Sequence, residues 1–351
     1  MGNYSKMISK THQTQPIPGK TMVKNNAGGY SFAVTNQELL ERFLLIGSEE
    51  GTYYVDKQTL TVENANAVIN YIKEDGFKVL STVVDVLKNK KAPKVDPSVF
   101  VLALLAAHGT AEVKKAVYAA IPMPGVLNTA TQLFMFLANV QNLRGWSRGL
   151  RTAVSKWYTL KTPKDVEYQV VKYRNREGFQ HRDVLRLSHA SSAEHNYIFQ
   201  YLTQEEGTAP EDNLLAAFEK AQMMEGKDLA EFIKEYRLTW KMIPNEQLNT
   251  PAILDALLVN MPVFALLRNL NRFASNGMTV GNSETTKAIV NKLSAENIKK
   301  SKVHSVTLLN ALRVYSSGHG DLGNKMWTPN QNINDALNNA YYAALEVLVP
   351  T

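Results

Sequence analysis

The sequence predicts an all-α protein built from many short helices that follow one another along the chain. Between residues 62 and 140, apolar residues recur at three- and four-residue spacing in one segment after another, which is the pattern of amphipathic helices. No segment there alternates apolar and polar residues as a half-buried strand would. The connectors are short and polar. Because each helix pair must bury its apolar face on the next, we expect an irregular array of antiparallel helix pairs of the HEAT type, without a visible sequence repeat.

The composition excludes several classes of protein. The 351 residues include no cysteine, so disulfide frameworks, thiolate catalysis and Cys-based zinc sites are ruled out, and a reducing intracellular setting is favoured. No apolar run approaches the roughly 20 residues that span a bilayer, and the polar N-terminal segment lacks the apolar stretch of a signal peptide. We therefore expect a soluble, cytoplasmic protein without membrane contact.

The net charge of +7 is sorted into blocks along the chain. Residues 144–189 contain eleven Lys and Arg against four Asp and Glu, and residues 266–325 contain nine against three. The intervening residues 205–246 are acidic, with five Lys and Arg against ten Asp and Glu. Charges of both signs mixed evenly along the chain would serve solubility equally well. The separation into basic and acidic blocks therefore favours basic surface patches that bind a polyanion.

Residues 1–28 are expected to form a flexible, polar N-terminal arm, and residues 29–351 one folded module. The arm contains Gly19-Lys20-Thr21, a fragment of a phosphate-binding loop. Thr14 stands where that loop requires its first glycine, so the sequence predicts no nucleotide site.

The first helix is expected to begin at Thr35 or Asn36, which are good helix-capping residues. Further helices are expected over residues 62–73, 79–87, 97–107, 111–121, 128–140 and 143–158. The last of these has an apolar stripe of Trp146, Leu150, Val154 and Trp157 and a basic stripe of Arg144, Arg148 and Arg151. We expect the apolar stripe to pack in the core and the basic stripe to face outward.

The stretch Lys172–His189 predicts two helices that meet at Gly178, because glycine readily ends a helix. Lys172 and Arg176 would then lie four residues apart on one helix face. Arg182, Arg186 and His189 would share a face of the second helix at i, i+4 and i+7. Most charge runs are solvated helix faces, and spacing alone favours that plain interpretation.

In the second half of the chain, helices are expected around residues 214–223, 229–238, 251–258, 261–270, 307–315 and 332–347. Arg268 and Arg272 share a helix face, as do Lys299 and Lys302. The segment Gly318–Gly323 fits the spacing of a dinucleotide-binding loop, but it follows a helix and not a strand, so we expect a glycine-rich turn.

No catalytic arrangement is visible in the sequence. The seven histidines are dispersed, and none belongs to a metal-ligating pair such as that of a zinc protease. We therefore expect no enzyme activity, no catalytic residue, no metal ligand and no cofactor.

Several motifs resemble those of one known family. The stretch Lys172–His189 is similar to the RNA-contacting segment of the Ro ribonucleoprotein autoantigen family, with one extra residue, Glu177, before its glycine–aromatic pair. Further matches are Gly47–Tyr54, Trp146–Tyr158, Met261–Leu270, Gly281–Glu284 and Gly318–Trp327. The resemblance extends over nearly the whole chain from about Gly29 onward, and it indicates a bacterial- or phage-type member.

The resemblance implies a TROVE module over residues 29–351, in which HEAT-like helices close into a ring with a central hole. In that family, Y RNA binds outside the ring and single-stranded 3′ ends of misfolded noncoding RNAs enter the hole. The implied partners are a Y-like noncoding RNA and misfolded noncoding RNA, and an exoribonuclease tethered through the RNA is a further one. We expect the helical module alone, because the Asp-x-Ser-x-Ser motif of the family's von Willebrand A-type domain does not occur in this sequence.

The family places its main Y RNA contacts at the positions of Lys172, Arg176 and His189. From this resemblance and the shared basic faces, the expected RNA-binding residues are Lys172, Arg174, Arg176, His181, Arg182, Arg186, His189, Arg148, Arg151, Arg268 and Arg272. The implied role is quality control of noncoding RNA. The alternative is a helical-repeat scaffold for protein–protein interaction, in which the basic blocks serve acidic partners.

Overall fold

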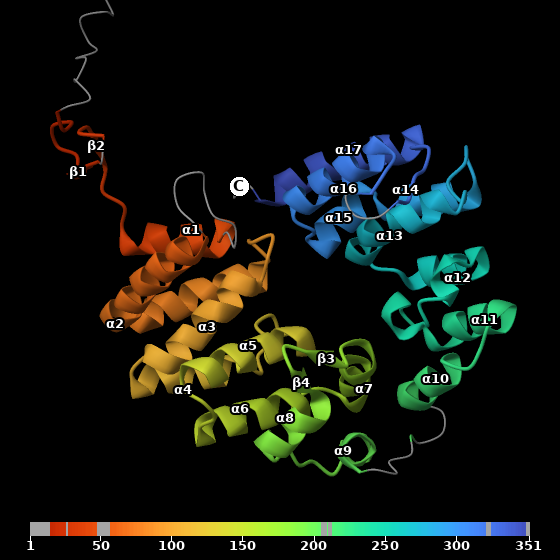
Figure 1. Cartoon of the computed structure of the whole chain (residues 1–351), viewed down its shortest axis with the longest axis horizontal. Helices are drawn as coiled ribbons and strands as arrows, with labels where there is room; N and C mark the ends of the chain where they lie inside the picture. The colour runs from red at the N-terminus through yellow and green to blue at the C-terminus, as the bar shows by residue number, and fades with distance from the viewer. Residues whose placement is uncertain are drawn as a thin grey trace, which may run out of the picture.

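The computed structural model describes residues 15–25, 27–47, 57–204, 209, 213–320 and 324–348. Over these residues the chain is almost entirely helical, apart from two short β-hairpins. The helices follow one another around a curved path, so that the last helices return toward the side of the first ones (Figure 1). In the described part of the chain, no helix combines the length and hydropathy needed to cross a membrane.

The first hairpin pairs β1 (Met22–Lys24) with β2 (Tyr30–Phe32) in antiparallel register. The predicted boundary between arm and module, at residues 28 and 29, falls between these two strands. Helix α1 (Asn36–Ile46) follows, and its N-cap is Thr35, as predicted. The Thr35 side chain accepts a hydrogen bond from the Glu38 amide while the Glu38 carboxylate accepts one from the Thr35 amide. This reciprocal pair fixes where α1 begins.

Two predicted helices merge into α2 (Lys57–Asn89), which is interrupted by non-helical backbone angles at Asp75. Helices α3 (Asp96–His108), α4 (Ala111–Ala120) and α5 (Ala130–Leu143) come next, close to their predicted bounds. In α3, residues 97–106 are buried with the single exception of Phe100. A helix that is apolar on all sides must be enclosed, and α3 packs against both α2 and α5.

The predicted helix over residues 143–158 is wrong at its start. Helix α5 ends at Leu143, Gly145 adopts a left-handed conformation with φ of +75°, and α6 (Arg148–Thr159) begins after its N-cap Ser147. Arg144 therefore lies in a connector, where its Nη1 donates a hydrogen bond of 2.7 Å to the Ala106 carbonyl. The glycine ends one helix and the serine starts another within a single apolar pattern.

The prediction of two helices meeting at Gly178 is also wrong. Helix α7 (Pro163–Lys172) ends at Lys172, and a hairpin of β3 (Asn175–Arg176) and β4 (Phe179–Gln180) separates it from α8 (His181–Ser188). Glu177 and Gly178 both have positive φ, 53° and 77°, which is the backbone pattern of a tight two-residue hairpin turn. Arg176 thus lies on a strand and shares no helix face with Lys172.

The remaining elements complete the path (Figure 1). They are α9 (Asn196–Thr203), α10 (Leu214–Ala221), α11 (Gly226–Tyr236), the 3-10 helices η2 (Trp240–Met242) and η3 (Gln247–Asn249), α12 (Pro251–Asn260), α13 (Val263–Ser275), α14 (Glu284–Lys292), α15 (Ala295–Ser301), α16 (Ser305–Ser317) and α17 (Gln331–Leu348). The helices predicted in this half are present, with ends that differ by a few residues. Of the motifs Gly47–Tyr54 and Gly318–Trp327, residues 48–54 and 321–323 lie outside the described residues.

The two halves of the chain meet where the connector after α2 faces the end of α15. The Lys90 ammonium donates a hydrogen bond of 3.2 Å to the Ser301 carbonyl. His304, which follows α15, is hydrogen-bonded to the backbone of Lys91. These contacts join the connector between α2 and α3 to the connector between α15 and α16.

Candidate nucleic-acid interface

A cavity of about 640 Å³ is lined by residues from widely separated parts of the helical path. The lining comes from the α2–α3 and α4–α5 connectors, α5, the end of α7, β3, η2, α13 and the α15–α16 connector. In Figure 1 these segments face the centre of the helical path. We call this space the central cavity.

The central cavity is strongly basic. Its lining includes the side chains of Lys90, Lys94, Lys172, Arg176, Lys241, Arg268 and Lys302. Among the described lining residues the single carboxylate belongs to Asp96. Seven cations around a space with one anion repel one another, and an anionic ligand would relieve that repulsion.

Lys172 is the last residue of α7 and is partly buried. Its ammonium donates a hydrogen bond to the hydroxyl of Tyr168, one helical turn earlier, and burial raises the pKa of that hydroxyl. The same ammonium lies 4.6 Å from the ring centroid of Tyr168 and 5.2 Å from that of Tyr173. Lys172 is thus held by aromatic groups.

Lys241 lies on η2 and reaches the same aromatic cluster. Its ammonium is 5.2 Å from the Tyr173 ring centroid and 5.8 Å from that of Trp240. Burial lowers the pKa of Lys241, and the nearby charges of Lys172, Arg268 and Arg176 lower it further. Lys241 therefore shares one electrostatic environment with these three cations.

Sequence reasoning missed Lys241, because it belongs to the acidic block of residues 205–246. The net charge of that block is negative, so it gave no sign that Lys241 lines the basic central cavity. The adjacent Trp240 was the one available indication, since sites for single-stranded nucleic acid combine basic and aromatic side chains.

Arg268 and Arg176 complete the cluster from opposite sides. Arg268 lies on α13, and its guanidinium carbon is 5.1 Å from the ring centroid of Phe264, one turn earlier. Arg176 makes an ion pair of 3.1 Å with Glu177, but both side chains are about half exposed. A pair this accessible to water is weak, so it leaves Arg176 available to a stronger anion.

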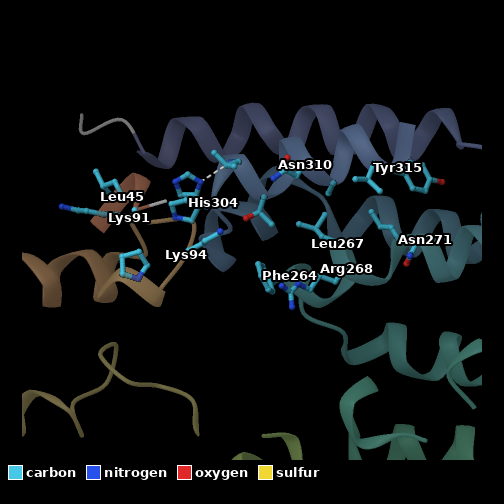
Figure 2. A pocket seen from close by; sticks show the side chains of 18 of the residues that line it. Leu45, Lys91, Lys94, Phe264, Leu267, Arg268, Asn271, His304, Asn310 and Tyr315 are labelled. Atoms are coloured by element: carbon cyan, nitrogen blue, oxygen red, sulfur yellow. Dashed lines mark hydrogen bonds between the residues drawn. The ribbon is translucent and has the colours of Figure 1, made fainter. Parts of the chain in front are cut away.

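A larger cavity of about 1130 Å³ adjoins the central one at the junction of the two chain halves. Figure 2 shows Lys91, Lys94 and His304 on one side of it and Phe264, Leu267 and Arg268 on the other. Lys94, Phe264, Arg268 and His304 line both cavities, so the two spaces are neighbours. Burial lowers the pKa of His304, although its hydrogen bond to the Lys91 backbone partly opposes that change.

A second group of basic side chains lies on α6 and α8 and at the residue after α8, and these helices are placed outside α5 relative to the centre (Figure 1). Arg151 donates hydrogen bonds of 3.0 Å to the Leu187 carbonyl and to Nε2 of His189. Arg148 and Arg182 are exposed, and Arg186 donates to the Thr203 carbonyl at 3.1 Å. We call Arg148, Arg151, Arg182, Arg186 and His189 the outer cluster.

The structure therefore divides the predicted RNA-binding residues between two places. Lys172, Arg176 and Arg268 line the central cavity, whereas His189 lies in the outer cluster. The expectation that Lys172, Arg176 and His189 act from one outer surface does not match this geometry, because Lys172 and Arg176 line the central cavity and His189 does not.

Arg174 and Arg272 belong to neither group. The Arg174 guanidinium carbon lies 4.6 Å from the ring centroid of Phe218 on α10. Arg272 lies near Lys325, and its Nη1 is within 3.4 Å of Oδ1 of Asn249. Both side chains meet local partners and neither lines the central cavity.

The prediction that His181 contacts RNA is contradicted by its burial, since only 2% of the residue is exposed. Its Nδ1 accepts a hydrogen bond of 2.9 Å from the Tyr158 hydroxyl, and Nε2 donates one of 3.2 Å to the Gln169 carbonyl. Burial lowers the pKa of His181 to about 4, so the ring is neutral at physiological pH. His181 is part of the core.

The described residues include no cluster of three or more His, Cys, Asp or Glu side chains that is arranged to hold a metal ion. The chemistry of both basic groups is that of anion binding: ammonium and guanidinium donors suit phosphate oxygens.

Together, a curved array of helix pairs and a basic central cavity define a helical-ring protein with a basic centre. The TROVE domain model matches residues 23–223 and 234–314, and the chain belongs to the TROVE-domain family. This confirms the resemblance predicted from the sequence.

Two relatives and one solved structure are among the proteins that are similar to this chain. The RNA-binding protein RO60 of Caenorhabditis elegans is 28% identical over 413 aligned residues, covering 94% of this chain and 64% of that protein. The RNA-binding protein RO60 of Deinococcus radiodurans is 30% identical over 339 residues, covering 93% and 63%.

The crystal structure of the Deinococcus radiodurans RO (RSR) protein superposes with a TM-score of 0.72 at 29% identity, covering 90% of this chain and 65% of that one. This confirms the predicted fold class, an all-α helical ring. The chain spans a little under two thirds of the length of these relatives.

Proposed function

We propose that this protein binds RNA and acts in the quality control of noncoding RNA. A single-stranded RNA end enters the central cavity, and a structured, Y-like RNA contacts the outer cluster. The observation that carries the proposal is the central cavity itself, whose described lining contains seven Lys and Arg side chains and one carboxylate. Both relatives are named RNA-binding proteins, which supports the same ligand class.

The two sites differ in shape, which supports binding of a single strand at one and of a duplex stem at the other. A single strand is flexible enough to enter an enclosed space and to bring its phosphates to the lysines there. A duplex is too wide and too stiff to follow, so it stays outside. An A-form stem presents phosphates and 2′-hydroxyl groups, which exposed arginines such as Arg148 and Arg182 can bind without reading bases.

The proposed partners are accordingly a Y-like noncoding RNA and misfolded noncoding RNAs that end in a single strand. An exoribonuclease tethered through a bound RNA fits the same scheme, because the outer cluster would hold the RNA while leaving most of it accessible. The role proposed for this chain is binding and not catalysis.

A scaffold for acidic protein partners is the second candidate, and one surface favours it. A groove of about 1060 Å³ between α4 and α6 combines the cations Lys114, Lys115 and Lys156 with exposed apolar side chains. Met123 and Leu160 are 46% and 69% exposed there. An apolar floor with a basic rim suits an acidic, amphipathic peptide.

Charge-reversal variants test the RNA proposal and separate its two sites. The double variant Lys172→Glu, Arg268→Glu should weaken binding of a single strand by about 1 to 3 kcal/mol per lost charge-assisted contact. The double variant Arg148→Glu, Arg182→Glu should instead weaken binding of a blunt stem. Fluorescence anisotropy with both RNAs measures the two affinities.

The matched control is Lys227→Glu, Lys234→Glu on α11, which makes the same change of net charge away from both sites. It should leave both affinities close to those of the parent. If the control weakens RNA binding as much as the cavity variant does, binding follows net charge alone and the proposed sites are wrong.

A further inference from the structure

We propose that the side-chain amine of Lys161 is an acylation site, which takes an acyl group from a phosphate-bearing donor bound in the groove between α4 and α6. The donor class comprises acyl phosphates and acyl thioesters of a phosphorylated carrier. Lys161 does not line the central cavity and does not belong to the outer cluster, so the inference is independent of the RNA proposal.

Lys161 lies in the connector between α6 and α7, and the structure holds it at both ends. Its amide donates a hydrogen bond of 3.3 Å to the Tyr158 carbonyl, and its carbonyl accepts one of 2.9 Å from Nε2 of the buried His195. Its ammonium lies over the ring of Trp157, 3.9 Å from the ring centroid. Trp157 is fully buried and donates a hydrogen bond to the Leu127 carbonyl, so the ring is fixed. The amine is therefore held at a defined place in the groove.

The amine of Lys161 is partly buried, and within the described residues it forms no ion pair. Burial removes water from an ammonium group and so favours the neutral amine. In agreement with this position, burial lowers the pKa of Lys161 from 10.5 to about 8, although the charge of Asp165 partly opposes the change. A neutral amine is a nucleophile and an ammonium is not, so the environment activates this side chain.

The groove also carries groups that suit the donor. Lys114, Lys115 and Lys156 line it, and Asp165 is the single carboxylate among its described lining residues. Ammonium groups bind phosphate oxygens through charge-assisted hydrogen bonds. The groove volume of about 1060 Å³ accommodates a small phosphate-bearing molecule beside Lys161. Donor binding and a nucleophilic amine thus occur in one space.

The proposed reaction is a simple acyl transfer. The lone pair of Lys161 Nζ attacks the carbonyl carbon of the acyl group, and a C–N bond forms. The bond from that carbon to the phosphate oxygen or to the thioester sulfur breaks, and the leaving group departs with the electron pair. The proton released by the nitrogen passes to the leaving group, and nothing is oxidised or reduced. The product amide is uncharged, so acylation removes one cation from the groove.

The plain alternative is that Lys161 only covers Trp157, since lysines commonly lay their apolar stems along aromatic surfaces. In that case the amine should react no faster than an ordinary exposed lysine. Lys164 is the matched comparison, because it is exposed on α7, three residues further along the chain, and does not line the groove.

The first experiment treats the full chain with a limiting amount of acetyl phosphate, acetyl-CoA or the uncharged donor p-nitrophenyl acetate. Mass spectrometry measures acetylation at each lysine, and the ratio of Lys161 to Lys164 cancels the intrinsic reactivity of each donor. A fall of the pKa from 10.5 to about 8 raises the neutral fraction at neutral pH about 300-fold. Lower basicity offsets part of this gain, so Lys161 should react about 10-fold faster than Lys164 or more. Equal rates at the two lysines would overturn the proposal.

The donor comparison tests phosphate recognition. The ratio should be larger for acetyl phosphate and acetyl-CoA than for p-nitrophenyl acetate, by about 3-fold or more. A larger ratio with acetyl-CoA than with acetyl phosphate would identify the phosphorylated carrier as the donor, and the reverse would identify the acyl phosphate. The variant Lys114→Gln, Lys115→Gln should reduce the ratio for both phosphate-bearing donors, whereas Lys227→Gln, Lys234→Gln on α11 should not. One ratio for all three donors would overturn the phosphate-bearing donor class.

A pH profile separates activation from simple access. The acetylation rate at Lys161 should reach half its maximum near pH 8, whereas an ordinary lysine gains reactivity up to about pH 10. The charged and titratable side chains around Lys161 are Lys114, Lys115, Arg144, Lys156, Asp165 and His195. Asp165→Asn removes the charge that opposes the lowering of the pKa, so the midpoint should move to lower pH.

The parent profile needs no variant, so it remains decisive if a variant fails to fold. A parent midpoint near pH 10 would show that burial does not activate Lys161, and the proposal would then be wrong. Lys161→Arg removes the reactive amine and checks the assignment of the acetylated peptide. Circular dichroism and thermal melting confirm that each variant is folded.

Discussion

At the residue scale, the structure separates two histidines that the sequence presents alike. His181 and His189 occur within one basic stretch, yet His181 is enclosed by Phe134 and Tyr158 while His189 is exposed and contacts Arg151. Periodicity could not distinguish them, because His181 follows a strand whose existence the helical pattern did not reveal. Because His181 is buried it belongs to the core, whereas the exposed His189 is accessible to a ligand.

The buried state of His181 predicts a pH-dependent stability. Its pKa is lowered to about 4 in the folded protein from 6.5 in the unfolded chain, so the unfolded chain binds the proton more readily. The contribution to stability is therefore fully present above pH 6.5 and is lost as the pH falls toward 4. The loss should reach about 3 kcal/mol.

Urea unfolding of the parent and of His181→Gln across this pH range measures the effect. The glutamine variant should be less stable at neutral pH by about 1 to 3 kcal/mol, because its amide replaces the histidine hydrogen bonds imperfectly. It should lose stability less steeply in acid. Parallel profiles for the two proteins would show that His181 does not titrate as its burial implies.

Lys241 predicts a pH dependence of binding. Burial and neighbouring cations lower its pKa from the ordinary 10.5, and a bound phosphate would raise it again. RNA binding should then take up a proton at alkaline pH, so affinity should fall as the pH rises through the lowered pKa. The variant Lys241→Arg should bind with a flatter alkaline profile, because a guanidinium stays protonated there.

Anisotropy titrations at increasing pH check this prediction, with Lys234→Arg on α11 as the control. The control should keep the parent profile, since Lys234 lies outside the cavity. A flat profile in the parent would mean that Lys241 is not coupled to the ligand.

At the scale of elements, helices were predictable and short hairpins were not. Apolar spacing located α3, α4, α5, α12 and α17 within a few residues, because each buries several apolar residues at helical spacing. Two-residue strands such as β3 and β4 are too short to show alternation. Gly178 was recognised as a break, but a helix cap and a hairpin turn both require a residue with positive φ.

The β3–β4 turn predicts a specific backbone effect. Gly178 has φ of +77°, and a Cβ there would meet no atom within 4 Å, so Gly178→Ala introduces backbone strain without a steric clash. The variant should lose about 1 kcal/mol of stability. It should also weaken RNA binding slightly, since the same turn orients Arg176 on β3.

Urea unfolding measures the stability change, and Gly277→Ala is a suitable comparison. Gly277 has φ of +70° and is equally open, but it lies after α13 and away from both basic groups. Both variants should be destabilised to a similar extent, and Gly178→Ala alone should affect RNA binding. Equal affinities for the two would show that the turn does not position the site.

At the scale of the whole molecule, closure of the helical path creates the candidate site. Lys90 and Lys302 are more than two hundred residues apart in sequence, yet they line one cavity with Lys241 from the acidic block. No local pattern could bring these residues together. The ring was expected from the family resemblance, and the composition of its centre became visible only in the folded chain.

The central claim is that a single strand enters the ring while a duplex stays outside. The most direct measurement is a side-by-side competition among a hairpin with a 3′ single-stranded tail, the same hairpin with a blunt end, and a longer blunt duplex whose charge matches the tailed hairpin. The tailed hairpin should bind best. Its salt dependence should be steeper than that of the blunt hairpin by about 0.7 log units of affinity per log unit of salt for each tail phosphate neutralised. A ranking by total charge, with the blunt duplex equal to the tailed hairpin, would contradict entry of the strand into the central cavity.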